Sequence, residues 1–362
     1  MKQKGIVISL AAIWLLLTAA AWFGPVMDIS LSERRPLAQR PELNGNTLLK
    51  GEFMEDFESY TLDQFPLRDG FRTVKSLFHY YVLNQSDNNG IYLAQGMAAQ
   101  QEYPLNEDSI RHAGQRFTEI YEKYLTDSQV YMAIVPDKGQ YLAEGSGHLT
   151  LHFGKMNTIL REEMPWATHV NLYDTLSYED YYRTDTHWRQ EQLLDTAGRL
   201  CEALGMPKPA AKDYTVTALE KPFYGVYYGQ AALPMEPETI YLMENERTAQ
   251  CAVFDYETGK TGSVYDRSKL SSRDLYDVYL SGAKSLLTIE NPLAATEREL
   301  IIFRDSFGSA IAPLLIQDYA RVTLVDIRYI QSSMLPQYLD FYGQDVLFLY
   351  STLVLNNSST IK

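Results

Sequence analysis

Two short segments hold residue types that together can form a catalytic triad. Residues 182–188 read Tyr-Arg-Thr-Asp-Thr-His-Trp and place Asp185 two positions before His187. Residues 303–308 read Phe-Arg-Asp-Ser-Phe-Gly and hold Ser306. A serine hydroxyl becomes a good nucleophile when a histidine takes its proton and an acid orients that histidine. The pattern therefore predicts serine-based hydrolysis or acyl transfer, with Ser306 as nucleophile, His187 as base and Asp185 as the orienting acid.

Ser306 is predicted to lie where a strand delivers the chain to a helix. Residues 300–303 form an apolar run, and the apolar residues of 307–317 recur at helical spacing. Free backbone N–H groups gather at a helix start, so the N–H groups of Ser306 and Phe307 are candidate oxyanion donors. The alternative is that Asp305 or Ser306 is simply an N-cap.

The other segment is expected to open a helix over 187–204. A carboxylate and an imidazole two residues apart can meet when the first lies in a turn. The alternative makes Asp185 an N-cap and leaves His187 on the surface. Trp188 is expected either to pack and fix the loop or to offer a surface on which an acceptor stacks.

The composition limits the partners of the protein, and the N-terminal segment predicts where the protein is located. The 362 residues are 46% hydrophobic and carry a formal charge of −14, which disfavours nucleic acid or anionic lipid headgroups as the main partner. Residues 5–24 contain no charged side chain and follow Lys2 and Lys4. This stretch is long enough to span a bilayer and predicts an uncleaved anchor in the cell membrane, with the body outside the cytoplasm. Secretion after signal cleavage is the alternative.

The sequence gives little indication of a disulfide or of a metal site. An exported protein could join Cys201 to Cys251, but Cys201 lies within a helical pattern, where a buried free thiol is equally compatible with the sequence. No metal-ligand spacing appears, and no metal or cofactor is expected.

The order of elements predicts an α/β protein. Strands at 129–135, 168–172, 300–303, 321–326 and 345–350 alternate with helices, as in a mostly parallel sheet covered on both faces. We divide the chain into an anchor at 1–27, a helical lead-in at 28–110 and an α/β domain at 111–362. Residues 213–295 are rich in Tyr and Thr and are expected to be a β-rich insertion.

Several motif blocks in order resemble one family. The Asp-Thr-His-Trp at 185–188 and the later strand–Asp-Ser–helix segment resemble the DHHW-motif proteins, which are similar to the SGNH-like domains of periplasmic alginate O-acetyltransferases. The leader at 31–37, the Asp-Gln-Phe-Pro-Leu-Arg-Asp at 63–69, the Pro-Asp-Lys at 136–138 and the segment 322–329 resemble further family blocks.

The resemblance implies a three-layer α/β/α SGNH-hydrolase-like fold and a catalytic Asp185–His187–Ser306 set. It also implies O-acetyl transfer to a cell-envelope or secreted polysaccharide, with a membrane-bound O-acyltransferase as the expected acetyl supplier. Water in place of the sugar hydroxyl would make the protein a carbohydrate acetylesterase. A non-catalytic glycan-binding or assembly protein on the same fold is the remaining alternative.

The chain departs from the family pattern near both motifs. Thr186 replaces the second histidine of the name-giving motif, and Arg304 stands where SGNH enzymes usually have glycine. Arg304 is expected to narrow the site or to bind an anionic substrate. Candidate substrate-binding residues also include Trp188, Lys138 and Tyr350, and Asn356 is a candidate oxyanion donor.

Overall fold

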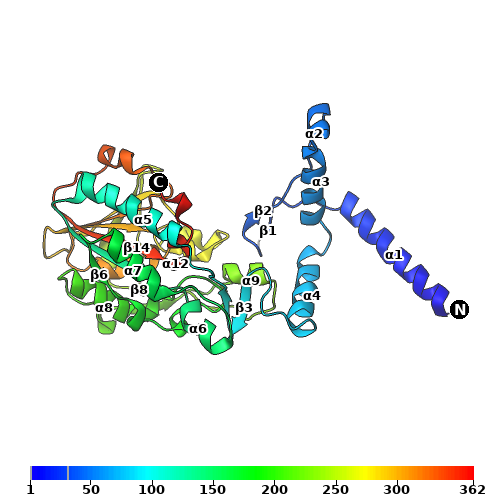
Figure 1. The fold of residues 1–362 in the computed structure, drawn as a ribbon, viewed down its shortest axis with the longest axis horizontal. Coiled ribbons are helices and arrows are strands. Elements are labelled where there is room, and N and C mark those ends of the chain that lie inside the picture. Colours follow the sequence, from blue (N-terminus) through cyan, green and yellow to red (C-terminus); the bar gives the residue numbers. More distant parts are fainter. Residues whose placement is uncertain (1, 31) are drawn as a thin grey trace. The chain divides into compact units, whose positions relative to one another are not determined.

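The computed structural model describes residues 2–30 and 32–362 (Figure 1). Leu31, which opens the leader block, lies outside the described residues. The chain divides into two compact units. The first holds residues 1–89 and 226–235, and the second holds residues 90–225 and 236–362.

The helices and strands account for both units. The α-helices are α1 (Lys2–Phe23), α2 (Gly45–Lys50), α3 (Glu52–Asp63), α4 (Arg68–Tyr81), α5 (Glu107–Ile120), α6 (Gly139–Ser146), α7 (Phe153–Glu163), α8 (Leu194–Ala203), α9 (Val226–Ala231), α10 (Glu246–Gln250), α11 (Gly308–Leu315) and α12 (Thr352–Leu355). The strands are β1 (Ile29–Ser30), β2 (Arg35–Pro36), β3 (Ile91–Ala94), β4 (Met97–Gln100), β5 (Gln129–Val135), β6 (Thr168–Val170), β7 (Thr215–Ala218), β8 (Tyr241–Glu244), β9 (Ala252–Asp255), β10 (Lys260–Gly262), β11 (Leu286–Glu290), β12 (Glu299–Arg304), β13 (Arg321–Val325) and β14 (Asp345–Ser351).

The larger unit is built on an eight-stranded mixed sheet in the order β10-β9-β11-β13-β12-β14-β5-β6. Strands β13, β12, β14, β5 and β6 run parallel to one another, as the alternation of strands and helices predicts. Strands β11, β9 and β10 continue the sheet antiparallel. Part of the β-rich region at 213–295 is therefore an extension of the sheet itself.

The sheet has a hydrophobic core on each face, which gives the predicted three layers. Because side chains of a strand alternate between faces, Leu300 and Ile302 of β12 enter one core while Ile301 and Phe303 enter the other. The first core includes residues of α6, α8 and α11. The second includes residues of α5 and α7 (Figure 1).

The parallel register brings three segments to one edge of the sheet. Arg304 pairs with Leu349 across β12 and β14, and Ser351 pairs with Val135 across β14 and β5. The chain leaves these strands at the same carboxyl edge, where α/β proteins collect ligands. Asp305 and Ser306 follow β12, Thr352 follows β14, and Lys138 lies just beyond β5.

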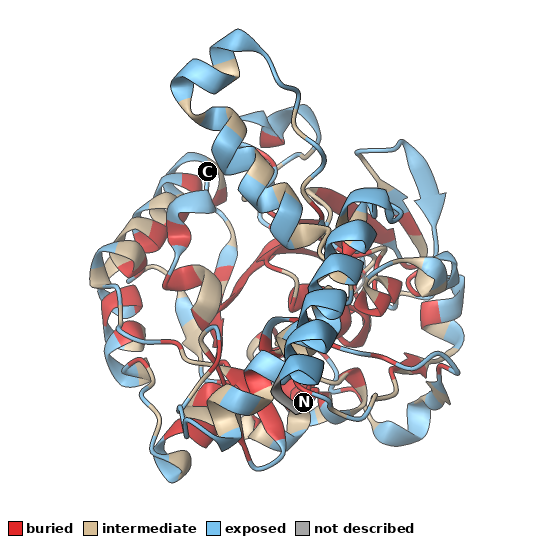
Figure 2. Ribbon diagram, turned by 90° about the vertical axis from the view of Figure 1, so that its right-hand side faces the viewer, coloured by how far each residue is buried: buried red, intermediate tan, exposed pale blue. Residues whose placement is uncertain are grey.

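The smaller unit begins with the apolar helix α1, whose segment Lys4–Phe23 is long and apolar enough to cross a membrane. The described side chains of α1 are almost all exposed (Figure 2). This agrees with an anchor and equally with a signal sequence.

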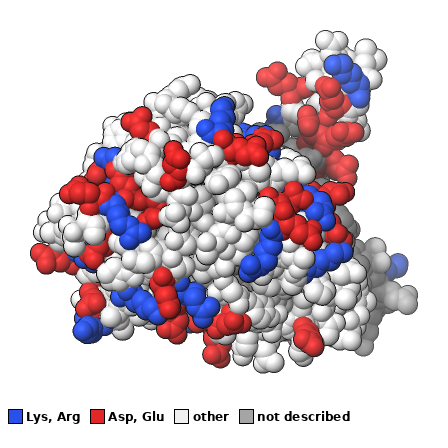
Figure 3. Space-filling view, turned by 60° about the vertical axis from the view of Figure 1, so that its left-hand side comes forward, with Lys and Arg blue, Asp and Glu red and all other residues white. Residues whose placement is uncertain are grey.

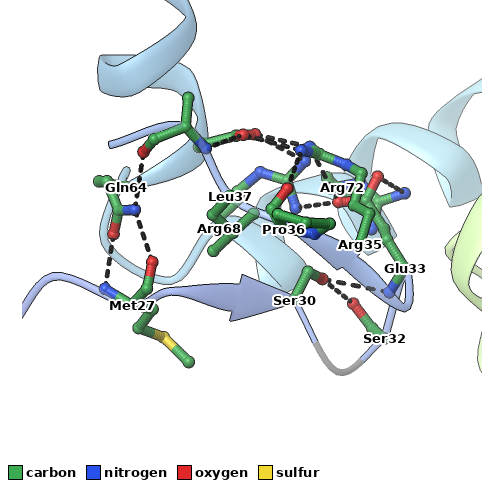
Figure 4. A network of polar contacts seen from close by, with 12 residues as sticks. Met27, Ser30, Ser32, Glu33, Arg35, Pro36, Leu37, Gln64, Arg68 and Arg72 are labelled. Atoms are coloured by element: carbon green, nitrogen blue, oxygen red, sulfur yellow. Dashed lines mark hydrogen bonds and ion pairs between the residues drawn. The ribbon is translucent and has the colours of Figure 1, made fainter. Parts of the chain in front are cut away.

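A network of ion pairs joins the leader block to the block at 63–69 in the smaller unit (Figure 4). Arg35 donates to both carboxylate oxygens of Asp63 at 2.8 and 2.6 Å. Arg68 pairs with Glu33 at 2.6 Å and lies 3.6 Å from Asp69. Arg68 therefore lies closer to Glu33 of the leader block than to its own neighbour Asp69.

Candidate active site

Ser306 lies on a tight turn between β12 and α11. Asp305 is buried and accepts hydrogen bonds from the N–H of Phe307 at 3.0 Å and of Ser351 at 2.8 Å. The first bond shapes the turn, and the second ties it to the end of the neighbouring strand β14. Ser306 itself is half-buried. The predicted placement of Ser306 between a strand and a helix is confirmed. The hydrogen bonds of Asp305 hold the turn that carries Ser306.

Asp185 and His187 lie in an irregular loop that does not open a helix. The prediction of a helix over 187–204 was wrong, because α8 begins only at Leu194 after a short 3-10 turn at Gln190–Gln192. An isolated bridge between Tyr181 and Trp188 closes the loop at its base. The N–H of Tyr182 also donates to the carbonyl of His187 at 3.0 Å.

The loop and the turn bring the three predicted site residues together. His187 Nδ1 lies 3.1 Å from Asp185 Oδ1, and His187 Nε2 lies 2.8 Å from Ser306 Oγ. Both distances are within the range of hydrogen bonds. The side chain of Asp185 is fully buried, that of His187 is 11% exposed and Ser306 is half-buried. Exposure to solvent therefore increases from the acid to the nucleophile.

Residues that follow His187 fasten the loop to the helix that follows Ser306. The indole N–H of Trp188 donates to the carbonyl of Phe307 at 3.1 Å. The side-chain amide of Gln190 donates to the carbonyl of Ala310 at 2.8 Å. These two bonds hold the base and the nucleophile in register, although 119 positions separate them in the chain.

Two charged side chains, those of Lys138 and Glu238, bond the backbone of the loop that carries Asp185. The ammonium group of Lys138 is fully buried and donates to the carbonyls of Tyr182 and Asp185, each at 2.7 Å. The carboxylate of Glu238 accepts from the N–H of Thr184 at 2.8 Å and from that of Arg183 at 2.7 Å. Burial lowers the pKa of Lys138 to about 8 against the raising effect of the charges of Asp137, Asp185 and Glu238.

Aromatic rings surround the imidazole. The ring of His187 stacks on that of Tyr276, with centroids 4.0 Å apart and planes 14° apart. Phe307 contacts the imidazole from another direction at 5.1 Å. This packing restricts rotation of His187 and excludes water from the Asp185 side of the ring.

The turn after β12 offers one of the expected oxyanion donors. The N–H of Phe307 is occupied by Asp305, and those of Gly308 and Ser309 bond to carbonyls within the turn. Within residues 2–30 and 32–362, the N–H of Ser306 meets no protein acceptor. Asn356 is excluded as a donor, because its side chain bonds the backbone of Asn106 and Pro104.

The four residues expected to contact substrate are all fully buried, so this interpretation is corrected. Trp188 packs on Phe307 and offers no stacking surface. Arg304 lies beneath the turn, where it donates to the carbonyl of Asp305 at 3.3 Å. Tyr350 stacks on Phe117 in the core. Lys138 holds the loop through carbonyl groups and does not reach the surface.

The described residues bear on the expectations for metal ligands and for the two cysteines. No group of three or more His, Cys, Asp or Glu side chains there could hold a metal ion. Cys201 and Cys251 are both buried free thiols. On the face shown in Figure 3, acidic and basic side chains are interspersed and form no continuous basic patch.

The residues that support the site were missed at the level of sequence. Gln190, Glu238 and Tyr276 act through partners far along the chain, and a single sequence carries no signal for such pairings. The Pro-Asp-Lys block did draw attention to Lys138, but its bonds could not be foreseen.

The mixed sheet with helices on both faces, and the serine turn at its carboxyl edge, define an SGNH-hydrolase-like α/β fold. Comparison with known proteins agrees. The model of a family described as "DHHW protein" matches residues 167–325, which include both motifs. This match confirms the resemblance to the DHHW family that the motif blocks indicate.

Solved structures share the fold at low sequence identity. A DHHW family protein from Eubacterium siraeum is 21% identical, with a TM-score of 0.63 over 76% of this chain and 95% of its own. PatB1 from Bacillus cereus, solved with a sulfonyl adduct, is 17% identical, with a TM-score of 0.59 over 73% of this chain and 95% of its own. A comparison with curated proteins finds no match.

Proposed function

We propose that the protein is an extracytoplasmic, serine-dependent O-acetyltransferase that acts on a cell-envelope or secreted polysaccharide. The observation that carries the proposal is the pair of contacts at His187, 3.1 Å to Asp185 and 2.8 Å to Ser306. A glycan-binding protein would have no need of a base bonded to a half-exposed serine.

The proposed reaction has two halves. In the first, His187 Nε2 takes the hydroxyl proton of Ser306 while Oγ attacks the carbonyl carbon of an acetyl donor. The donor's leaving group departs with that proton, and an acetyl ester remains on Ser306. In the second, His187 takes the proton of a sugar hydroxyl, whose oxygen attacks the acetyl carbon. Ser306 leaves and regains the proton from His187.

The other residues support these two steps. Asp185 holds the Nδ1 proton and stabilises the imidazolium that forms twice in the cycle. The N–H of Ser306, which bonds no acceptor in the described part of the chain, is suited to the negative oxygen of each tetrahedral intermediate. The apolar helix α1 is consistent with a membrane anchor, and a membrane-bound O-acyltransferase is the partner we propose as the source of acetyl groups.

The test uses the full chain in detergent with a chromogenic acetyl ester and, separately, with an acetyl donor and an oligosaccharide acceptor. Ser306→Ala and His187→Ala are each expected to abolish acetyl release. Ser309→Ala is the matched control, because its hydroxyl is buried three residues along and bonds no described protein group. Equal activity in all four proteins would contradict the proposal. Acetate formed without acetylated sugar would favour the acetylesterase.

A further inference from the structure

Helix α4 of the smaller unit is amphipathic with its apolar face turned outward. Leu67, at its N-cap, and five later residues share one side of the helix at intervals of three or four positions. They are between 49% and 77% exposed: Leu67, Phe71, Val74, Phe78, Tyr81 and Val82. We refer to these six residues as the α4 stripe.

The opposite side of α4 is polar and is the side that binds the rest of its unit. Ser76 is fully buried, and its hydroxyl donates to the carbonyl of Ala231 in α9 at 2.5 Å. Arg72 donates to the carbonyl of Gly229 at 2.7 Å and pairs with Glu33 at 3.2 Å (Figure 4). A soluble helix normally buries its apolar side, so the orientation of α4 is the reverse of the expected one.

The reversed orientation suggests an apolar environment next to α4. Exposure of large apolar side chains in a contiguous stripe is costly in water and marks an interaction surface. Rotating α4 to bury the stripe would break the bonds of Ser76 and Arg72. The helix is therefore held with its stripe outward.

Charge and chain position favour a lipid surface as the occupant. Arg68 and Arg72 of α4 are ion-paired with Glu33 within the unit, which leaves Lys75 as the exposed cation of the helix. Lys75 is exposed and is the residue next to Val74 of the stripe. An apolar side of Leu, Phe and Val bordered by an exposed lysine, with a polar side opposite, is a pattern of helices that lie in a membrane interface. The candidate span at Lys4–Phe23 precedes α4 in the same unit and would place a bilayer within reach.

We propose that α4 lies in the membrane interface through the α4 stripe and forms a second membrane contact besides the anchor. This contact is independent of the proposed chemistry and would limit how far the smaller unit moves from the bilayer. Its ligand is a phospholipid surface, whose phosphate groups the exposed ammonium of Lys75 beside the stripe can contact.

The test places the full-length protein in lipid nanodiscs that hold one copy each. An environment-sensitive fluorophore is attached to Val74→Cys or Phe78→Cys, and to Asp69→Cys on the polar side as the matched control. The unsubstituted chain gives the background, since Cys201 and Cys251 are buried. Discs contain lipids with a quencher on the acyl chain near the headgroup.

The proposal predicts a blue-shifted emission and a loss of intensity to the quencher at positions 74 and 78, and a much smaller loss at 69. Equal quenching at the three positions, or none, would overturn it. Apolar emission at position 74 that appears only when discs hold two copies, together with disulfide cross-links between two unlabelled Val74→Cys copies under oxidising conditions, would overturn it in favour of a second copy.

Discussion

At the scale of single residues, the proposed site depends on contacts of quite different predictability. Asp185, His187 and Ser306 could be chosen from sequence because triad chemistry restricts the residue types and their local setting. The prediction of four residues that contact substrate was wrong, because a motif does not show whether the residue beside it is packed beneath the site or exposed above it. Arg304 and Trp188 are both fully buried, which reverses their expected roles.

Removal of the ammonium group of Lys138 should disturb the position of Asp185 and His187 while the protein still folds. Lys138→Met keeps the length of the side chain but leaves the carbonyls of Tyr182 and Asp185 without their donor. A small shift of Asp185 and His187 should lower kcat by about 10²-fold with little change in KM. Steady-state acetyl release measures both constants.

The control is Lys284→Met, which removes a partly buried lysine that pairs with Asp255 and Glu257 in the sheet region. That variant should retain kcat.

The dependence of kcat on pH gives a second test of the role of Lys138. Because the ammonium of Lys138 has a pKa of about 8, wild-type kcat should fall above that pH while the free energy of unfolding rises up to about pH 10.5. A Lys138→Met enzyme with unchanged kcat would contradict this role.

At the scale of elements, the sheet and the serine turn were predictable, whereas the histidine loop was not. Apolar runs such as 129–135 and 300–303 determine buried strands, and the structure has them as β5 and β12. The apolar spacing after His187 suggested a helix start, but the bridge of Trp188 to Tyr181 and the bonds of Trp188 and Gln190 to α11 and its N-cap hold residues 188–190 outside a helix. Tertiary contacts of this kind override local propensity.

Gly225 should be essential to the shape of that loop. Its N–H donates to Thr184 Oγ1 at 2.9 Å, and an added Cβ would lie 2.2 Å from the carbonyl oxygen of Thr184 and 2.4 Å from Asp185 Cβ. Gly225→Ala is therefore expected to displace Asp185, to lower kcat at least tenfold and to cost about 1–3 kcal/mol of unfolding free energy. Chemical denaturation and acetyl release measure the two effects.

Gly262→Ala provides the comparison, since a Cβ at that position in β10 would meet nothing within 4 Å. It should leave both kcat and stability close to wild type. If Gly225→Ala behaved in the same way, the backbone of Thr184 would not be packed as tightly as the structure has it.

At the scale of the whole molecule, buried carboxyl groups at the carboxyl edge of the sheet should make stability depend on pH. Thr352 donates to Glu102 at 2.7 Å and accepts from the N–H of Asp137 at 3.2 Å. Burial, then the charge of Asp137, raises the pKa of Glu102 to about 8. Burial raises the pKa of Asp137 to about 6.

The sign of this effect follows from proton linkage. A carboxyl group with a raised pKa in the folded state holds its proton there longer than in the unfolded chain. Its contribution is complete below about pH 4.5 and is lost as the pH rises through about 8, at roughly 1.4 kcal/mol per unit of pKa shift. The Tm of wild type should fall over this range, and that of Glu102→Gln should fall less. Curves of Tm against pH that run parallel for the two proteins would contradict a raised pKa of Glu102 in the folded state.

The fold as a whole was predictable to the level of its layers, but its boundaries with the β-rich region were not. Alternating strands and helices establish the parallel part of the sheet. The antiparallel extension by β11, β9 and β10 depends on pairings across 213–295, such as Ile289 with Val253, that no periodicity signals. In α4, the helical pattern was visible, but which side faces outward depends on Ser76 and its distant acceptor.

The central claim is that Ser306 is a nucleophile activated by His187. The most direct measurement is mass spectrometry of the full chain after brief exposure to an acetyl donor without any sugar acceptor. The account predicts an acetyl group on Ser306 in wild type that transfers when an acceptor glycan is added. Ser306→Ala should remain unmodified, and His187→Ala should acetylate far more slowly. No acetyl group on Ser306 under conditions in which acetyl is released, or equal acetylation in His187→Ala, would contradict the account.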